Sequence, residues 1–337
     1  MHSGPLSPAS RWHIPGRCLL FFTLGLCIAA AAAAQPQPGQ KAESPAPVDQ
    51  SLHVRLKPLQ FNVDVVVVPV TVHDSMNRPV MGLTQNDFSV FEDSAEQKIR
   101  YFSDEDAPIS LGVLLDVSNS MKDKIDTARE AVVEFFKNSN PQDDCFVISF
   151  SDDPEVVADS TRSLAYMQAR LAEARPAGHT ALLDAIYLGL HKMRSARYQR
   201  RALLVISDGG DNHSRYSARE IRHMVEESDV QIYAVGLFSA IFKTPEEWGG
   251  QRLLSSITGA TGGRTLTIHN PAELPEAAGA ISRELRSQYV LGYSTSRAGD
   301  GKWRKIKVTA HPHNAPDHIQ VHNKPGYRAG VALQPNP

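Results

Sequence analysis

Cysteine is scarce in this sequence of 337 residues, which has three. Two of them, Cys18 and Cys27, lie in an apolar N-terminal run. Cys145 is then left without a partner in the rest of the chain, which excludes a disulfide-stapled fold. Because Cys145 stands in the apolar stretch CFVISF, we expect an inert core residue.

An excess of positive charge is also missing. The sequence has 35 Lys and Arg against 37 Asp and Glu, a formal net charge of -2. Nucleic-acid binding needs a clustered basic surface, so we expect no nucleic-acid partner. The sequence contains no P-loop, no G-x-S-x-G elbow and no internal repeat, which argues against P-loop NTPases, α/β-hydrolases and repeat architectures.

One long apolar run is present, CLLFFTLGLCIAAAAAA, and Arg11 and Arg17 precede it. This layout predicts a signal peptide over 1–34, cleaved after Ala34, and export to the periplasm or the medium. Its loss would take the net charge to about -4 and leave no membrane span. The run approaches spanning length, so a retained anchor is the alternative. Residues 35–58 are rich in Pro and Gln and predict a disordered linker, as do 330–337 for a tail.

Residues 59–107 read as short strands, and valine-rich FNVDVVVVPVTVHDS is their clearest example. Pro69 inside it predicts an edge position or a bulge. Strand character returns over 288–329, in YVLGYS, WRKIKVTAH and IQVHN. Each flank is too short to bury much surface alone, so we expect the two to pack into one small β-module.

Between the flanks, over 108–287, apolar strands alternate with helical periodicity. The strands are ISLGVLLDV, CFVISFS, RALLVISDG and QIYAVGLF, with GRTLTI as a further candidate and PEVVADS as an antiparallel edge. This alternation predicts an α/β domain with a doubly wound, mostly parallel sheet and helices on both faces.

Polar side chains follow the first of these strands. Asp116, Ser118 and Ser120 alternate directly after an apolar run, so an extended loop would point all three into one cavity. Ligands of open α/β sheets bind beyond the carboxyl ends of the strands, where this segment lies. The alternative for this segment alone is a helix N-cap by Ser120.

Two other segments supply the same kind of oxygen. Thr180 precedes an apolar helix, and Asp208 ends a second apolar strand before two glycines. Each could also be a simple cap or turn residue. Together the three segments offer two carboxylates and three hydroxyls, a hard oxygen set that suits Mg²⁺.

The pattern Asp116-x-Ser118-x-Ser120, then Thr180, then Asp208 resembles the metal-ion-dependent adhesion site of the von Willebrand factor type A (VWA) domain. The flanks resemble an exported bacterial group of VWA-related proteins. The resemblance implies that Ser118 and Ser120 bind the ion directly. Thr180 would bind directly or through water, and the two acids mainly through water. Mg²⁺ is the expected ion, with Mn²⁺ or Ca²⁺ as substitutes.

The resemblance implies a protein-binding or adhesion module rather than an enzyme. Its partner would present an Asp or Glu carboxylate to the open coordination position of the ion. One alternative is a metal-dependent phosphoryl-transfer or hydrolytic enzyme, for which Lys122 and Lys124 are the nearest cations in sequence. Another is a structural envelope-assembly component with an unused metal site.

Further residues are expected around the site. His179 stands where family members often have glycine, and its imidazole would tune access or pH response. Asp184 and Asp211 are nearby acids, and Asp184 is expected to buttress the Thr180 loop. Phe242 and Trp248, in an insertion between a strand and a helix, are candidates for a rim that contacts the partner.

Overall fold

The computed structural model describes residues 65–208, 210–239, 244–295, 297, 299–311 and 318–330. The predicted signal peptide, the 35–58 linker and Phe242 lie outside the described residues. So do residues 59–64 of the first β segment and 331–337 of the predicted tail. Among the described residues, no helix has the length and apolarity needed to cross a membrane.

The central sheet of the α/β part has six strands in the order β10-β9-β8-β5-β6-β7. They are β5 (Ser110–Asp116), β6 (Asp144–Phe150), β7 (Pro154–Thr161), β8 (Arg201–Ser207), β9 (Val230–Leu237) and β10 (Thr265–Ile268). Every pairing is parallel except that of β7 with β6. The predicted α/β class with a mostly parallel sheet is therefore confirmed, and so is the antiparallel edge strand.

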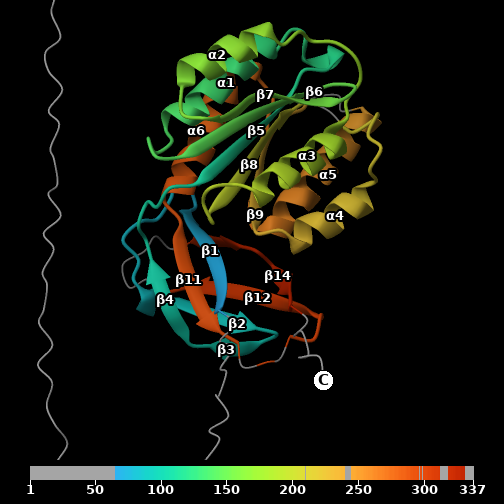
Figure 1. The fold of residues 1–337 in the computed structure, drawn as a ribbon. Coiled ribbons are helices and arrows are strands. Elements are labelled where there is room, and N and C mark those ends of the chain that lie inside the picture. Colours follow the sequence, from blue (N-terminus) through green and yellow to red (C-terminus); the bar gives the residue numbers. More distant parts are fainter. Residues whose placement is uncertain are drawn as a thin grey trace, which may run out of the picture. The chain divides into compact units, whose positions relative to one another are not determined.

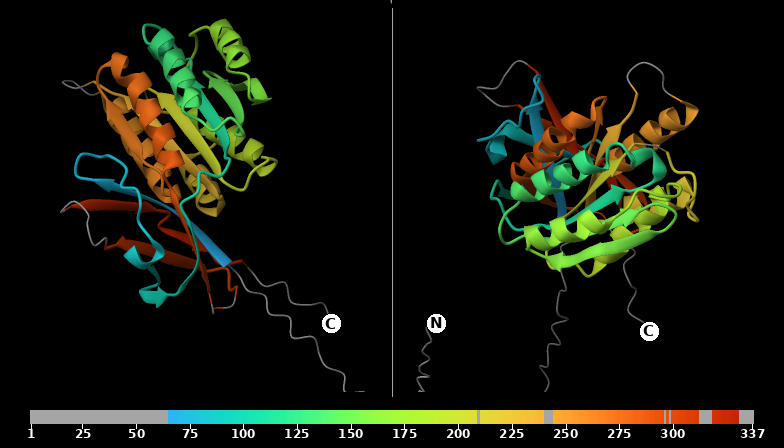
Figure 2. Two further views of the ribbon diagram at one scale, coloured as in Figure 1. Left: turned by 90° about the vertical axis from the view of Figure 1, so that its left-hand side faces the viewer. Right: turned by 90° about the horizontal axis from the view of Figure 1, so that it is seen from above.

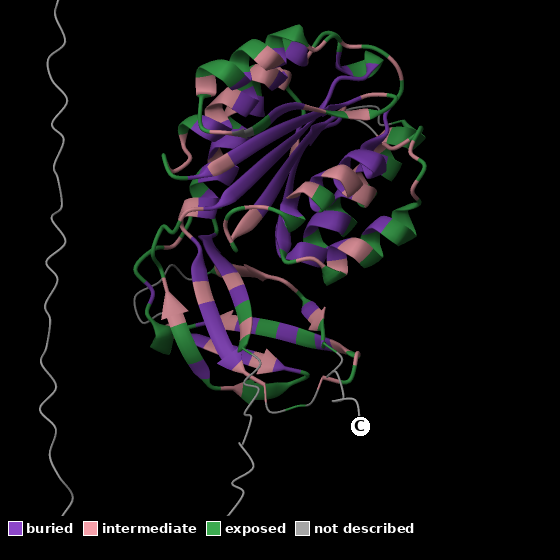
Figure 3. Ribbon diagram, in the orientation of Figure 1, coloured by how far each residue is buried: buried purple, intermediate pink, exposed green. Residues whose placement is uncertain are grey.

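Helices cover both faces of this sheet (Figure 1; Figure 2). One face carries α1 (Ile125–Lys137), α2 (Leu164–Glu173) and α6 (Leu274–Arg286), and the other α3 (Leu182–Arg194), α4 (Ala218–Glu227) and α5 (Pro245–Thr261). Alternate residues of a strand point to opposite faces, so Val113 of β5 packs in the core of the first face and Leu114 in that of the second. The inner strands β5, β8 and β9 are accordingly buried along almost their whole length, whereas the edge strands β7 and β10 are only partly buried (Figure 3).

Local sequence explains where these helices lie. The side chains that α1 turns toward the sheet are buried and include Val132 and Phe135. α5 begins earlier than the sequence suggested, because Thr244 and Glu247 form a capping box and Pro245 occupies the first turn. Trp248 therefore lies on the first turns of a helix and not in a loop insertion. Cys145 is buried in β6, which raises the pKa of its thiol and fits an inert core residue.

The flanking segments form two four-stranded sheets, ordered β13-β1-β11-β4 and β14-β12-β2-β3. The first flank supplies β1 (Val65–Asp74), β2 (Phe88–Glu92), β3 (Ala95–Gln97) and β4 (Ile99–Ser103). The second supplies β11 (Tyr289–Ser294), β12 (Trp303–Ala310), β13 (Ile319–Asn323) and β14 (Gly326–Arg328). Both flanks thus contribute to both sheets, and one apolar core lies between them.

Pro69 lies within β1, opposite Val290 of β11. The pairing of β1 with β13 begins only at Val70. Pro69 therefore stands where β1 is paired on one side, an edge position that needs no second ladder bond and suits a residue without an N–H.

A buried ion cluster joins the β-module to the α/β part. Glu284 of α6 pairs with Arg264 at 2.6 Å and with His73 of β1 at 3.3 Å. Thr71 also donates its hydroxyl to Glu284, at 3.4 Å. Because Glu284 is only 1% exposed, its charge depends on these partners.

Candidate metal centre

Asp116 ends β5 and is fully buried. Its carboxylate accepts hydrogen bonds from the backbone N–H of Ser118, at 2.9 Å, and from the hydroxyl of Ser207, at 2.6 Å. Burial raises the pKa of this carboxyl to about 6, although the bonds from Ser118 and Ser207 oppose the rise; the nearby charge of Asp208 adds to it. Both oxygens of Asp116 are thus held in place by the ends of β5 and β8.

Ser118 directly precedes a short 3₁₀ helix, η2 (Asn119–Met121), and Ser120 lies within it. Ser118 occupies the N-cap position with extended backbone angles, but its side chain makes no capping hydrogen bond. Its hydroxyl lies 3.0 Å from that of Ser120, which donates to Asp208 at 2.7 Å. The N-cap interpretation of Ser120 is therefore wrong, because its hydroxyl bonds across to the neighbouring strand end.

Asp208 directly follows β8 and is 5% exposed. Besides the Ser120 hydroxyl, its carboxylate contacts the ammonium group of Lys124, in the residue before α1. The Lys124 side chain is 30% exposed. A positive charge therefore already balances the acidic end of the sheet, and it comes from a flexible side chain that reaches solvent.

Thr180 lies in the loop before α3 and is 5% exposed. Its backbone N–H donates to the Asn212 side chain at 2.8 Å, and its carbonyl accepts from the backbone N–H of Asn212, at 3.0 Å. The same loop accepts at Gly178 from Asn119, at 3.2 Å. These bonds tie the Thr180 loop to η2 on one side and to the segment after Asp208 on the other.

The nearby acids Asp184 and Asp211 stabilise these loops. Asp184 accepts from the backbone N–H groups of Arg215 and Tyr216, at 2.9 and 3.1 Å, and pairs with the Arg215 guanidinium. Asp211 accepts from the backbone N–H of Leu183 at 3.2 Å. Both therefore brace the loop after β8 against the start of α3.

The remaining candidates lie at the surface. The His179 side chain is 66% exposed and contacts Asp152. Trp248 is 54% exposed. Its helix begins beside the loop after Asp208, since a Cβ on Gly210 would lie 3.0 Å from the Glu246 carbonyl oxygen.

Three participants at the site are not among the residues that the sequence assigned to it. Ser207 holds Asp116, Asn212 holds Thr180, and Lys124 pairs with Asp208. Ser207 and Asn212 had a signal, because they directly precede or closely follow Asp208 in the ISDGGDN segment. Lys124 was noted only as a nearby cation, since periodicity does not tell which way a long side chain turns.

The donor chemistry fits a divalent cation that prefers oxygen. Carboxylates and hydroxyls are hard ligands, and two buried carboxylates would balance a charge of about +2. The Lys124 ammonium group places a positive charge beside Asp208, as a bound cation would. Asp116, Ser118, Ser120 and Asp208 are linked by the contacts above, and Thr180 lies in a loop bonded to the same segments.

Comparison with known proteins gives one family and several similar structures. Residues 111–210, which contain all the predicted ligands, match the von Willebrand factor type A domain family. A conserved hypothetical protein, BatB from Bacteroides thetaiotaomicron, is 19% identical, over 52% of this chain and 97% of that one, with a TM-score of 0.43. A von Willebrand factor type A protein from Catenulispora acidiphila is 11% identical, over 81% of this chain and 75% of that one, with a TM-score of 0.46.

A third similar structure is the vWF domain of the type V pili tip protein Mfa5 from Porphyromonas gingivalis. It is 12% identical, over 52% of this chain and 94% of that one, with a TM-score of 0.44. The comparison with curated proteins finds no match.

Proposed function

Since residues 111–210 belong to a von Willebrand factor type A domain, we propose that the protein is a metal-dependent binding module for an acidic group of a partner protein. The residues proposed to hold the Mg²⁺ ion are Asp116, Ser118, Ser120, Thr180 and Asp208. Mn²⁺ or Ca²⁺ would substitute for it. Export by the N-terminal segment, to the periplasm or the medium, is part of the proposal.

The observation that carries this proposal is the chain of contacts from Ser118 through Ser120 to Asp208 and Lys124. Hydroxyls that served only to cap a helix would bond to backbone N–H groups of that helix. The hydroxyls of Ser118 and Ser120 instead bond to each other and to the carboxylate of Asp208, which directly follows β8. The ammonium group of Lys124 neutralises that carboxylate. That is the environment expected of groups that share an ion.

The charge balance favours binding of an acid. When bound, the metal supplies a Lewis-acidic position that attracts a carboxylate. Asp116 and Asp208 supply two negative charges, and the hydroxyls of Ser118, Ser120 and Thr180 add none. A third carboxylate from the chain itself would weaken the attraction for an incoming acid.

Phosphoryl transfer is less well supported by the same geometry. That chemistry usually needs a Lys or Arg to neutralise the transferred group. Lys124 is engaged by Asp208, so a phosphate would compete with a carboxylate for its charge. We therefore propose binding without catalysis.

The test is capture of a partner by the immobilised full chain from envelope extract of the producing organism. We expect a protein that is retained with Mg²⁺, released by EDTA, recovered on adding Mg²⁺ back, and displaced by an acidic peptide. Asp116→Ala and Ser118→Ala should abolish its capture. Asp159→Ala is the matched control, because this acid lies on β7 with a 57% exposed side chain. Equal capture in EDTA would refute metal dependence.

A further inference from the structure

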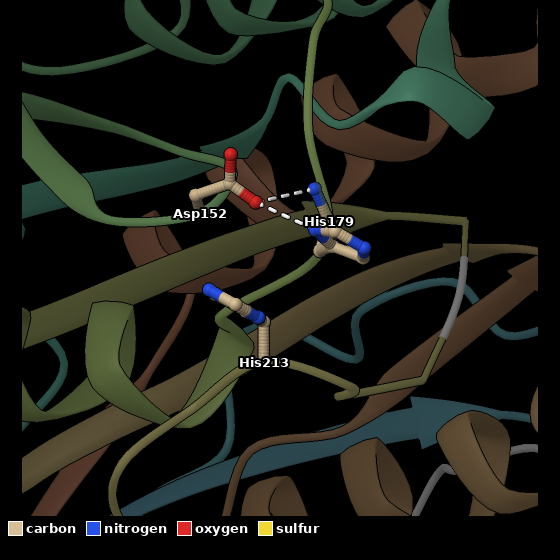
Figure 4. Close-up of side chains that lie close together, drawn as sticks. All are labelled: Asp152, His179 and His213. Carbon is tan, nitrogen blue, oxygen red and sulfur yellow. Dashed lines mark hydrogen bonds and ion pairs between the residues drawn. The ribbon is translucent and has the colours of Figure 1, made fainter.

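Three side chains of types that can bind a metal ion lie close together at the Thr180 loop. They are Asp152, from the turn between β6 and β7, His179, and His213, from the segment after β8 (Figure 4). One ligand atom from each lies within 4.8 Å of those from the other two. Each residue comes from a different loop, so the group is assembled by the fold and not by spacing in the sequence.

The backbones that carry these side chains are fixed to one another. His179 donates its backbone N–H to Asp152 at 2.8 Å. His213 donates its backbone N–H to the Thr180 carbonyl at 3.2 Å, and Ala181 donates to the Ser151 carbonyl at 2.8 Å. The loops are therefore preorganised, while the side chains themselves remain exposed.

Glycine at 178 allows the carboxylate to approach. Gly178 has a φ of +76°, and a Cβ there would lie 2.4 Å from an oxygen of Asp152. Any other residue would be strained and would push this carboxylate away. Glycine at this position therefore lets the Asp152 carboxylate lie against His179.

The two imidazoles lie against each other and beside the Asp152 carboxylate. The backbone N–H of His179 already bonds to Asp152, and its ring Nδ1 lies 2.8 Å from the same oxygen. The His213 ring stacks on that of His179, with centroids 4.9 Å apart and planes at 14°. Two adjacent imidazoles beside a carboxylate therefore form a donor set of the kind that binds a transition metal.

We propose that Asp152, His179 and His213 bind a Zn²⁺ ion, at a site separate from the magnesium centre. Two imidazoles and one carboxylate suit Zn²⁺, whereas Mg²⁺ prefers oxygen ligands alone. Ligands about 2.0–2.1 Å from a tetrahedral Zn²⁺ lie roughly 3.3 Å apart. Rotation of the exposed side chains closes the remaining gap.

Three protein ligands leave one coordination position open. His179 directly precedes Thr180 in the chain, so both proposed ions would bind to one loop. The zinc site does not depend on the magnesium site, because the two share no ligand.

The experiment is a Zn²⁺ titration of the EDTA-stripped full chain against a chromophoric chelator, with the visible absorption of bound Co²⁺ as a second readout. We expect the His179→Ala/His213→Ala double variant to bind one equivalent fewer than the unmodified chain. Each single variant, and Asp152→Asn, should weaken that equivalent by about 10- to 100-fold or more, since even changes around metal ligands have effects of that size.

Two controls separate this site from other metal binding. His223→Ala, on α4 with a 60% exposed side chain, and Asp116→Ala should both keep the zinc equivalent. The result that overturns the proposal is unchanged stoichiometry and affinity in the double variant. A lower metal-free unfolding temperature in His179→Ala, with zinc binding unchanged, would also overturn it, because the cluster would then be a loop contact.

Discussion

The ammonium group of Lys124 pairs with the carboxylate of Asp208 across the carboxyl edge of the central sheet. Lys124 precedes α1 and Asp208 follows β8, 84 residues apart in the chain. The same carboxylate accepts the Ser120 hydroxyl. A chain-borne cation thus balances an acid that we assign to the metal centre, and the two cations would compete for Asp208.

This competition predicts the behaviour of Lys124→Met. Without the ammonium, Asp208 keeps a buried and poorly paired charge, so the metal-free protein should lose about 1–3 kcal/mol of unfolding free energy. Mg²⁺ should bind several-fold more tightly, because it no longer displaces an ammonium. Urea unfolding in EDTA and in saturating Mg²⁺ measures both effects.

Lys122→Met is the control, because Lys122 is exposed on the same turn. It should leave both quantities unchanged. If Lys124→Met were as stable as the unmodified chain in EDTA, or bound Mg²⁺ more weakly, Lys124 and Mg²⁺ would not compete for Asp208.

Because Asp116 titrates, we expect the unfolding free energy and the Mg²⁺ affinity to change in opposite directions with pH. Its pKa of about 6 in the folded protein lies above the ordinary 3.8. The folded metal-free state therefore holds this proton more tightly than the unfolded state, and its stability should fall as the pH rises from about 4 to about 6, by roughly 3 kcal/mol. Mg²⁺ binding needs the carboxylate and should weaken as the pH falls below 6.

Asp116→Asn keeps the shape of the side chain and removes its titration. In EDTA its unfolding free energy should lack the component that falls between pH 4 and pH 6. Unfolding curves across this window measure the difference between the two proteins. An identical pH profile for both would show that Asp116 does not titrate there.

The fold was largely predictable, and so was the set of residues at the sheet edge. The apolar runs of β5 and β8 lead to Asp116 and Asp208, and parallel strands bring such ends to one edge, where the two acids are linked through the serines. The contacts of Asp152 with His179 were not predictable. They depend on the left-handed backbone of Gly178 and on loop–loop hydrogen bonds, which leave no periodic pattern in the sequence.

The ion pairs of Glu284 join the β-module to the α/β part, so we expect them to contribute to the unfolding free energy of the protein. Burial alone would raise the pKa of Glu284, but the His73 hydrogen bond and the Arg264 charge outweigh it, so the pKa lies below its usual value. This pairing therefore stabilises the fold at neutral pH, and the contribution should be lost as the pH falls below about 4. Glu284→Gln leaves Arg264 without its charge partner and should cost about 3–5 kcal/mol in urea unfolding at neutral pH.

Glu276→Gln is the matched control on the same helix. Glu276 pairs with Arg283, but its side chain is 81% exposed, so its loss should cost at most about 1 kcal/mol. Equal effects of the two variants would mean that the buried cluster adds nothing beyond a surface ion pair.

The most direct measurement is calorimetric titration of the EDTA-stripped full chain with Mg²⁺ at neutral pH, for the unmodified protein, Asp116→Ala, Ser118→Ala and His179→Ala/His213→Ala. We expect a single Mg²⁺ equivalent in the unmodified protein, retained in the histidine double variant and weakened at least about tenfold in Asp116→Ala and Ser118→Ala. Mg²⁺ binding of unchanged affinity in Asp116→Ala and Ser118→Ala, or no binding to the unmodified protein, would contradict the proposed metal centre.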